Sequence, residues 1–293
     1  MLSSSIQSSP TACTDTIEDI VLRHSGRGMT ILRDYLEPDY CRRAAQSILA
    51  LPKGVIFLAT GFYVSGHAET DGPPGTFCLA LALRRLGYLP VIITDEICRG
   101  LFEPEKLEVK YVSTDTDASF YEAMLALYQP VCLISVERCG RNLDNDYANM
   151  RGVSIAAQTA RIDTLFELAA RAGIYTVGIG DGGNEIGMGN LREIINEKLS
   201  LNPCAVTVDT LIIATTSNWG AYALAAWLGI LRHRKTLPTF AKILSYLEKI
   251  VGVGCVDGVT GQSVATVDGF PITVGQEIVD ALNHTTASFL IRY

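Results

Sequence analysis

The sequence repeats one local pattern five times from residue 54 onward: a short apolar segment rich in β-branched residues, a loop rich in Gly and polar residues, then a helical segment. The apolar segments are 55–60, 91–94, 131–136, 175–179 and 210–215. They are too short for helices, and strands that alternate with helices form right-handed βαβ units. We therefore predict a doubly wound α/β fold: a mostly parallel sheet with helices on both faces, in a Rossmann-like three-layer arrangement.

Helices are predicted between these strands and on both sides of the repeating core. The predicted helical ranges are 16–36, 39–51, 75–86, 119–128, 159–172, 220–232, 238–251 and 275–290. Residues 255–271, rich in Gly and Val, suggest a short hairpin or extra strands. The Ser-rich residues 1–14 are predicted to form a flexible tail, and residues 15–293 a single domain, because no low-complexity linker divides them.

Composition narrows the range of partners. Hydrophobic residues make up 48% of the chain and charged residues 19%, as expected for strands covered on both faces. The net charge of −7, with no basic run longer than residues 232–235, predicts no nucleic-acid partner. The most apolar stretch, 211–231, contains four consecutive polar residues at 215–218, so we predict no membrane partner.

Cysteine usage suggests a compartment. The eight cysteines are scattered, without a C-x-x-C pair, and are interpreted as reduced thiols. This pattern predicts a cytoplasmic protein, or one of the mitochondrial matrix in a eukaryote. The sequence leaves homo-oligomerisation open.

Carboxylates gather in the loops that follow the predicted strands. Any one of them alone is typical of turns and helix caps, but ligands of an open parallel sheet bind at the carboxyl ends of its strands. We therefore predict a functional site at this edge. The predicted catalytic residues are Glu69, Asp71, Asp181 and Glu185. No organic cofactor is predicted; a divalent metal, Mg²⁺ or Mn²⁺, is left open, with Asp95, Glu137 and Asp181 as candidate ligands.

The loop at 180–189 has five glycines in ten residues. The backbone N–H groups of Gly182 and Gly183 can form an anion-binding nest, but the loop lacks the G-x-G-x-x-G spacing and the Walker lysine of nucleotide sites. Asp181 and Glu185 in the same loop would repel a phosphate. An ammonium group or a metal therefore fits this loop better.

The loop after residue 136 supplies the opposite charge. Arg138, Arg141 and Arg151 each offer a planar fork to a substrate carboxylate, although Arg141 can equally pair with Asp144, Asp146 or Glu137. The remaining predicted substrate-binding residues are Gly182 and Gly183, whose N–H groups can hold a carboxylate, and Asn184, Ser217 and Asn218.

Taken together, these loops resemble the D-glutamate cyclase family, in the C-terminal type of domain. The segments that carry the resemblance are ETDGPPG at 69–75, ERCGR at 137–141, YANMRG at 147–152, GDGGNEIGMG at 180–189 and SNWG at 217–220. The resemblance covers nearly the whole chain. It implies a carbon–oxygen lyase that converts the small acidic amino acid D-glutamate to 5-oxo-D-proline with loss of water. Larger members carry a further N-terminal domain.

Two other functions use the same loops. A non-catalytic module that binds an amino acid or carboxylate needs the pocket without a proton donor or base. A metal-dependent hydrolase or phosphatase is favoured by the carboxylates after four of the five strands.

Overall fold

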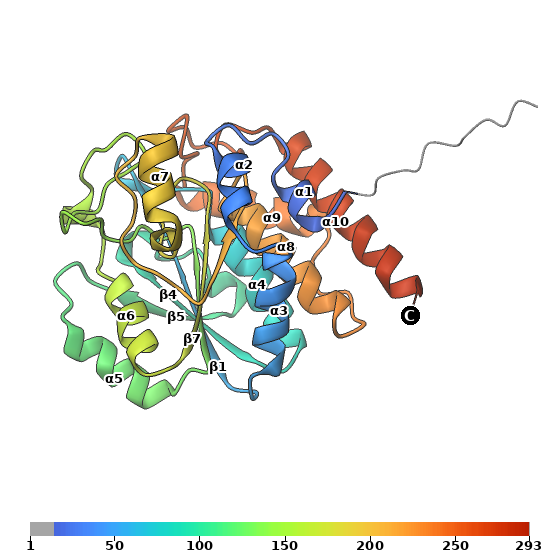
Figure 1. The fold of residues 1–293 in the computed structure, drawn as a ribbon, viewed down its shortest axis with the longest axis horizontal. Coiled ribbons are helices and arrows are strands. Elements are labelled where there is room, and N and C mark those ends of the chain that lie inside the picture. The colour runs from blue at the N-terminus through green and yellow to red at the C-terminus, as the bar shows by residue number, and fades with distance from the viewer. Residues whose placement is uncertain (1–14, 293) are drawn as a thin grey trace, which may run out of the picture.

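A computed structural model describes residues 15–292; the predicted tail at residues 1–14 lies outside the described residues. Six parallel strands form the main sheet, in the order β5-β4-β1-β6-β7-β8 (Figure 1). Their bounds are β1 Val55–Thr60, β4 Leu89–Asp95, β5 Glu108–Val112, β6 Cys132–Val136, β7 Tyr175–Gly180 and β8 Thr210–Ile213. The predicted doubly wound α/β fold is confirmed.

The strand order places a topological switch point between β1 and β6. The chain runs outward from β1 through β4 to β5, then returns to pair β6 with the other side of β1 and continues outward to β8. At the carboxyl ends of this central pair, Thr60 lies opposite Val136. The loops after β1 and β6 leave in opposite directions, and such a divergence opens the crevice where ligands of these sheets bind.

Helices cover both faces of the sheet (Figure 1). On one face lie α5 (Ala118–Tyr128) and α6 (Asp163–Arg171), and on the other lie α3 (Tyr40–Ala50), α4 (Pro73–Arg85) and α8 (Ser217–Ile230). All five residues of β6 are buried, which explains why the strand segments are continuously apolar instead of alternating.

An outer layer of helices lies beyond the three predicted layers. The helices α1 (Ile17–Val21) and α10 (Ile272–Arg292) pack on α8, and α9 (Phe240–Val253) packs on α4 and α10. All 14 residues of α8 are buried, since a helix that is apolar all round needs cover on every side. Among residues 15–292, no helix has the length and apolarity needed to cross a membrane.

Several elements differ from the predicted ones. The edge strand β5 was not predicted, because its half-exposed residues include Glu108 and Lys110. The predicted helix 16–36 is broken near Gly28, which has a φ of +82°, into α1, α2 (Met29–Leu32) and the 3₁₀ turn η1 (Arg33–Tyr35). Residues 255–271 form isolated bridges and loops. The other unpredicted elements are β2 (Tyr63–Val64), β3 (His67–Ala68), α7 (Arg192–Leu199), η2 (Glu96–Cys98), η3 (Glu103–Glu105), η4 (Ala156–Gln158) and η5 (Met188–Leu191).

The close approach of α4 to α8 depends on Gly75. A Cβ at this position would lie 2.8 Å from the Cβ of Ala221 and 3.0 Å from the Cα of Asn218. We expect Gly75→Ala to lower the free energy of unfolding by about 1–3 kcal/mol through overpacking, as measured by urea denaturation. The control is Gly252→Ala in α9, where no atom lies within 4 Å of the new Cβ, so stability should rise by up to about 1 kcal/mol. Equal losses in the two variants would contradict this packing.

Candidate active site

Three buried carboxylates meet at the switch point. Asp71 lies in the loop between β3 and α4, Glu137 directly follows β6, and Asp181 directly follows β7. One carboxylate oxygen of each lies within 4.8 Å of the other two. Residues from separate loops are therefore close enough to share one cation. We call Asp71, Glu137 and Asp181 the carboxylate cluster.

Asp71 is held by the first turn of α8. Its carboxylate accepts hydrogen bonds from the backbone N–H groups of Ser217 and Asn218, both at 2.8 Å, and from that of Gly72 at 3.0 Å. A helix N-terminus favours a negative charge. Burial, followed by repulsion from Asp268, nevertheless raises the pKa of Asp71 to about 7, against the lowering effect of these N–H groups.

Glu137 is held in a strained conformation. Its φ is +46°, which is uncommon for a residue other than glycine, and such strain concentrates at functional sites. The Ser217 hydroxyl donates a hydrogen bond to its carboxylate at 2.5 Å. Burial raises the pKa of Glu137 well above its usual range, and repulsion from Glu185 and Glu69 adds to the effect.

Arg27 binds Asp181 and links distant parts of the chain. It donates to Asp181 at 2.9 Å and to Asp268 at 3.0 Å, while its own side chain is 27% exposed. The second oxygen of Asp181 is buried without a hydrogen-bond partner. Burial, then repulsion from Glu137, raises the pKa of Asp181 in spite of Arg27.

Sequence reasoning missed Arg27 and Asp268, because both lie outside the loops that follow the strands. Arg27 lies between two glycines, Gly26 and Gly28, and Asp268 precedes Gly269. This local pattern is the only signal that could have drawn attention to them.

Glu69 lies beside the carboxylate cluster. It is buried, and one of its carboxylate oxygens has no hydrogen-bond partner. The backbone of Gly258 passes so close that a Cβ there would lie 2.3 Å from the other oxygen. Burial, then repulsion from Asp268 and Asp71, raises the pKa of Glu69 well above its usual range.

A cavity of about 660 Å³ reaches the carboxylate cluster at Glu137. Its lining includes Glu69, Glu137, Arg27, Arg151 and Asn184. This volume is ample for an amino acid, and the lining supplies both charges that an amino acid carries.

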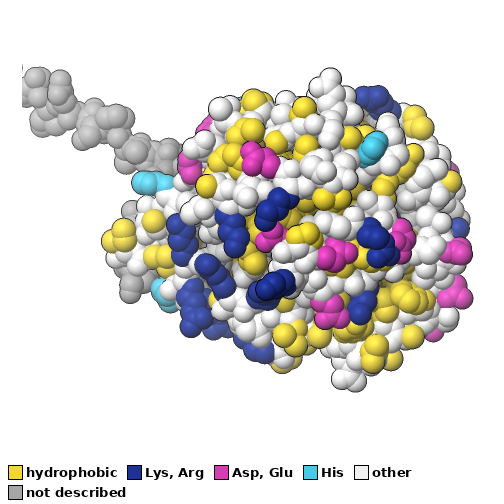
Figure 2. All heavy atoms as spheres, turned by 180° about the vertical axis from the view of Figure 1, so that it is seen from behind, with side chains coloured by type: hydrophobic (Ala, Val, Ile, Leu, Met, Phe, Trp, Pro, Cys, Tyr) yellow, Lys and Arg dark blue, Asp and Glu magenta, His cyan; other side chains and the backbone are white. Residues whose placement is uncertain are grey.

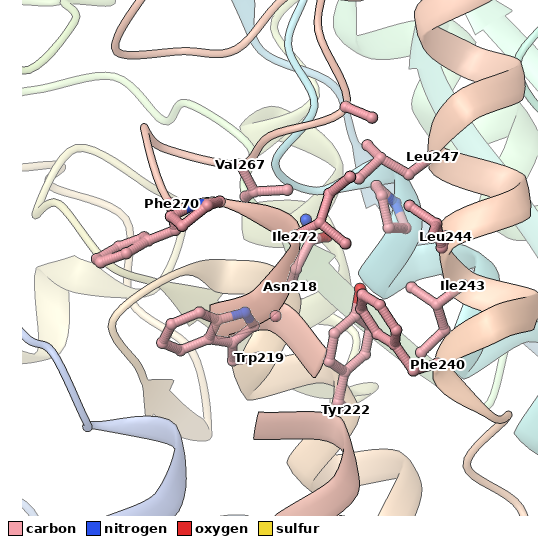
Figure 3. Close-up of a pocket in the computed structure, with 14 residues that line it drawn as sticks. Asn218, Trp219, Tyr222, Phe240, Ile243, Leu244, Leu247, Val267, Phe270 and Ile272 are labelled. Atoms are coloured by element: carbon pink, nitrogen blue, oxygen red, sulfur yellow. The ribbon is translucent and has the colours of Figure 1, made fainter. Parts of the chain in front are cut away.

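A separate pocket shown in Figure 3 is apolar. Trp219, Tyr222 and Phe240 are among its lining residues, and its volume is about 30 Å³. That space is comparable with one water molecule, so this pocket is a packing gap beside α8.

Glu185 occupies the predicted anion nest. Its carboxylate accepts hydrogen bonds from the backbone N–H groups of Gly182 and Gly183, both at 2.7 Å. These donors, predicted to bind a substrate carboxylate, are therefore engaged internally. Asn184 faces the cavity, and its side-chain oxygen has no hydrogen-bond partner.

Ser217 and Asn218 hold the loops of the site together. The Asn218 side chain accepts hydrogen bonds from Gly72 N–H at 3.1 Å and from Gly75 N–H at 2.7 Å, and it donates to the Thr70 carbonyl at 3.0 Å. Ser217 contacts Asp71 and Glu137. Both predicted substrate-binding residues thus position the carboxylate cluster.

Arg138 and Asp95 form a buried ion pair that lies apart from the carboxylate cluster. The Arg138 side chain is fully buried; it contacts both oxygens of Asp95 and donates to the carbonyls of Gly61 and Ala160 at 2.9 and 2.6 Å. This placement differs from the predicted substrate contact of Arg138 and metal contact of Asp95. A buried guanidinium needs a carboxylate partner, and Asp95 is the one within reach.

The other two predicted arginines differ in position. Arg141 pairs internally with Glu167, and not with Asp144, Asp146 or Glu137 as the alternative prediction had it. Arg151 is exposed and lines the cavity. Of the three arginines, Arg151 is the one placed to meet a ligand.

The fold and the site together define an α/β protein of the doubly wound class, with a polar, small-molecule-sized cavity at its switch point. The model of the family described as D-glutamate cyclase-like, C-terminal, matches residues 17–283. The chain therefore belongs to the D-glutamate cyclase-like family, which confirms the resemblance found in its loops.

One curated relative is the mitochondrial D-glutamate cyclase of Homo sapiens, 34% identical in an alignment of 222 positions that covers 67% of this chain and 35% of the relative. The chain thus spans about a third of the length of that relative.

Solved structures are more distant. An exopolyphosphatase-related protein from Bacteroides fragilis is 10% identical, with a TM-score of 0.41, over 88% of this chain and 63% of that chain. The Bordetella bronchiseptica enzyme WbmG, in complex with NAD and UDP, is 16% identical, with a TM-score of 0.30, over 60% of this chain and 49% of that chain. Similarities this weak carry no argument about the site.

The buried ion pair is expected to matter for stability. Lysine cannot reproduce the two-pronged contact of Arg138 with Asp95. We expect Arg138→Lys to lower the free energy of unfolding by about 3 kcal/mol, whereas Arg151→Lys, at an exposed position, should change it by less than about 0.5 kcal/mol. Chemical denaturation of both variants measures the difference. Equal stability of the two variants would show that Arg138 has no structural role.

The like charges of the carboxylate cluster are expected to cost stability. A raised pKa means that the folded state holds its proton more tightly, so wild-type stability falls as pH rises above the ordinary glutamate value of 4.5. The Glu137→Gln variant has no charge at this position, so it lacks the repulsion. Its amide oxygen can still accept the hydrogen bond from the Ser217 hydroxyl. In metal-free buffer at pH 7, we expect it to be more stable than wild type by about 1 kcal/mol or more, with a gap that narrows towards pH 4. Thermal unfolding across this pH range tests it; a gap that does not vary with pH would contradict the assignment.

Proposed function

We propose that this chain catalyses the cyclisation of D-glutamate to 5-oxo-D-proline with loss of water. The observation that carries the proposal is the carboxylate cluster, whose member Glu137 lines a cavity together with Glu69 and Arg151. Membership of the D-glutamate cyclase-like family supports the choice of reaction. The proposal assigns the activity to this chain, although it spans about a third of the curated relative.

The reaction sets the chemical requirements of the site. A bond forms between the α-nitrogen and the side-chain carboxyl carbon, and a carbon–oxygen bond of that carboxyl group breaks. The ammonium group loses two protons, and these leave with the departing oxygen as water. The site must therefore hold the two carboxylates of the substrate, accept protons from nitrogen and return them to oxygen.

Glu69 is our choice for the proton carrier. It lines the cavity, and one of its oxygens has no internal partner. The raised pKa makes its carboxylate a stronger base than an ordinary glutamate, so it can take a proton from the ammonium group. Once protonated, the same group can deliver the proton to the leaving oxygen.

The carboxylate cluster fits a divalent cation such as Mg²⁺ or Mn²⁺. Both ions prefer oxygen ligands, and Asp71, Glu137 and Asp181 each present one within 4.8 Å of the others. The partnerless oxygen of Asp181 agrees with this assignment. Such an ion, when bound, polarises a carboxyl group and stabilises negative charge that develops on its oxygen.

Arg151 and Arg27 have different roles in this proposal. Arg151 lines the cavity with an exposed guanidinium, and we assign it to the α-carboxylate of the substrate. Arg27 stays with Asp181 and Asp268, where it offsets part of the negative charge of the site.

The same proposal includes a reducing compartment, the cytoplasm or, in a eukaryote, the mitochondrial matrix. The seven cysteines among the described residues are all free and buried. The name of the human relative places that protein in mitochondria.

The purified chain is incubated with D- or L-glutamate, with Mg²⁺, Mn²⁺ or a chelator, and 5-oxoproline is followed by chiral chromatography. We expect product from the D isomer, loss of activity with the chelator, and a decrease in kcat of about 10²- to 10⁴-fold in Glu69→Gln. The matched control is Glu122→Gln, an exposed position on α5, which should retain wild-type kcat.

Other outcomes identify the rival functions. Binding of D-glutamate without product under any condition would favour a carboxylate-binding module. Metal-stimulated hydrolysis of a generic phosphate ester would favour a hydrolase. Unchanged turnover in Glu69→Gln would remove Glu69 from the mechanism.

A further inference from the structure

Six exposed cations gather at the end of the molecule that holds the amino ends of the strands. The group, which we call the basic patch, consists of Lys53, Arg84, Arg85, Arg232, Arg234 and Lys235. Figure 2 shows dark blue side chains crowded together on one part of the surface, with few magenta ones among them. The chain as a whole carries a net charge of −7, so the local charge of this group is opposite in sign to the overall charge.

The fold brings these residues together from three segments. Arg84 and Arg85 end α4, residues 232–235 follow α8, and Lys53 lies just before β1. The Arg85 guanidinium donates to the Lys235 carbonyl at 2.7 Å, and the Arg234 guanidinium donates to the Arg85 carbonyl at 3.4 Å. These bonds hold Arg85 and Arg234 against each other's segments, with Lys235 next to them in sequence.

Neighbouring contacts extend the basic patch towards α3. The Arg232 guanidinium donates to the Leu49 carbonyl at 2.9 Å, and the Lys53 ammonium lies 3.6 Å from the centre of the Tyr88 ring. Partial burial and then repulsion from Arg232 lower the pKa of Lys53. The partners of these cations are carbonyls and a ring, which leave the positive charge in place.

Within residues 15–292, no carboxylate forms an ion pair with any of the six cations of the basic patch. Arginines elsewhere on the surface do have such partners, for example Arg43 with Glu37 and Arg99 with Glu96. The basic patch is therefore a region of unbalanced positive charge.

We propose that the basic patch binds the surface of an anionic phospholipid membrane. Four of its six cations are arginines, whose planar forks suit phosphate oxygens. They are spread over the ends of several elements, which suits a broad charged surface. Leu89, the first residue of β4 and next to Tyr88, is 63% exposed and adds an aliphatic group that can enter the headgroup layer.

A nucleic acid fits the basic patch less well. Single strands bind through bases that stack on exposed aromatic rings. Tyr88, whose ring lies against Lys53, is buried. It offers no free ring face for stacking.

Binding here leaves the cavity open to water. The basic patch adjoins the amino ends of β1 and β4, whereas Glu137 and Asp181 follow the carboxyl ends of β6 and β7. The sequence predicted no membrane partner because polar residues at 215–218 interrupt its most apolar stretch. Its longest basic run is 232–235. The fold adds Lys53, Arg84 and Arg85 to that run.

The test is cosedimentation of the whole chain with vesicles of phosphatidylcholine alone or of phosphatidylcholine mixed with phosphatidylserine. We expect binding to the mixed vesicles only, and loss of binding at 1 M salt, where the screening length falls to about 3 Å. Arg85→Glu combined with Arg234→Glu should weaken binding by at least about tenfold. Leu89→Ser should weaken it less and leave the salt dependence unchanged.

The matched control is Arg171→Glu combined with Lys198→Glu, which makes the same change of net charge on α6 and α7. It should bind like wild type, and the thermal unfolding of both double variants shows whether they remain folded. Equal weakening in the two double variants would reduce the effect to net charge and overturn the proposal. Absence of binding to mixed vesicles at low salt would also overturn it, as would tighter binding to duplex DNA than to the vesicles.

Discussion

The mutual repulsion of buried carboxylates at the switch point is the constraint on which the rest of the site depends. Asp71, Glu137 and Asp181 share a space less than 5 Å across, with Glu69 beside them. The fold accommodates these three carboxylates because each one binds a different partner. The N-terminus of α8 holds Asp71, the Ser217 hydroxyl holds Glu137, and Arg27 holds Asp181. The divalent cation of the proposed function would neutralise the negative charge that remains.

The central elements could be predicted from sequence, because their cause is local. Five strands of the main sheet were recognised from short β-branched runs. The edge strand β5 was missed because Lys110 lies on a half-exposed surface that hides the apolar pattern. Since the loops follow the strands, the residues of the carboxylate cluster could also be placed together in advance.

The pairings within the site could not be predicted, because they depend on which side chain lies within contact distance of each buried charge in the folded protein. Arg138 was expected to face a ligand, yet Asp95 binds it inside the protein. Gly182 and Gly183 were expected to bind a substrate carboxylate, yet Glu185 from the same loop takes their N–H groups. No spacing in the sequence distinguishes a carboxylate of the protein from one of a ligand.

The link from Arg27 to Asp268 has a consequence for biosynthesis. Arg27 is made 241 residues before Asp268, and all six strands of the main sheet lie between them in the sequence. The sheet can therefore begin to form on the nascent chain while Arg27 still lacks one of its two carboxylates. The full set of charges comes together only after residue 268 has been made, so a nascent chain in which the sheet has formed does not yet have all the charges of the site.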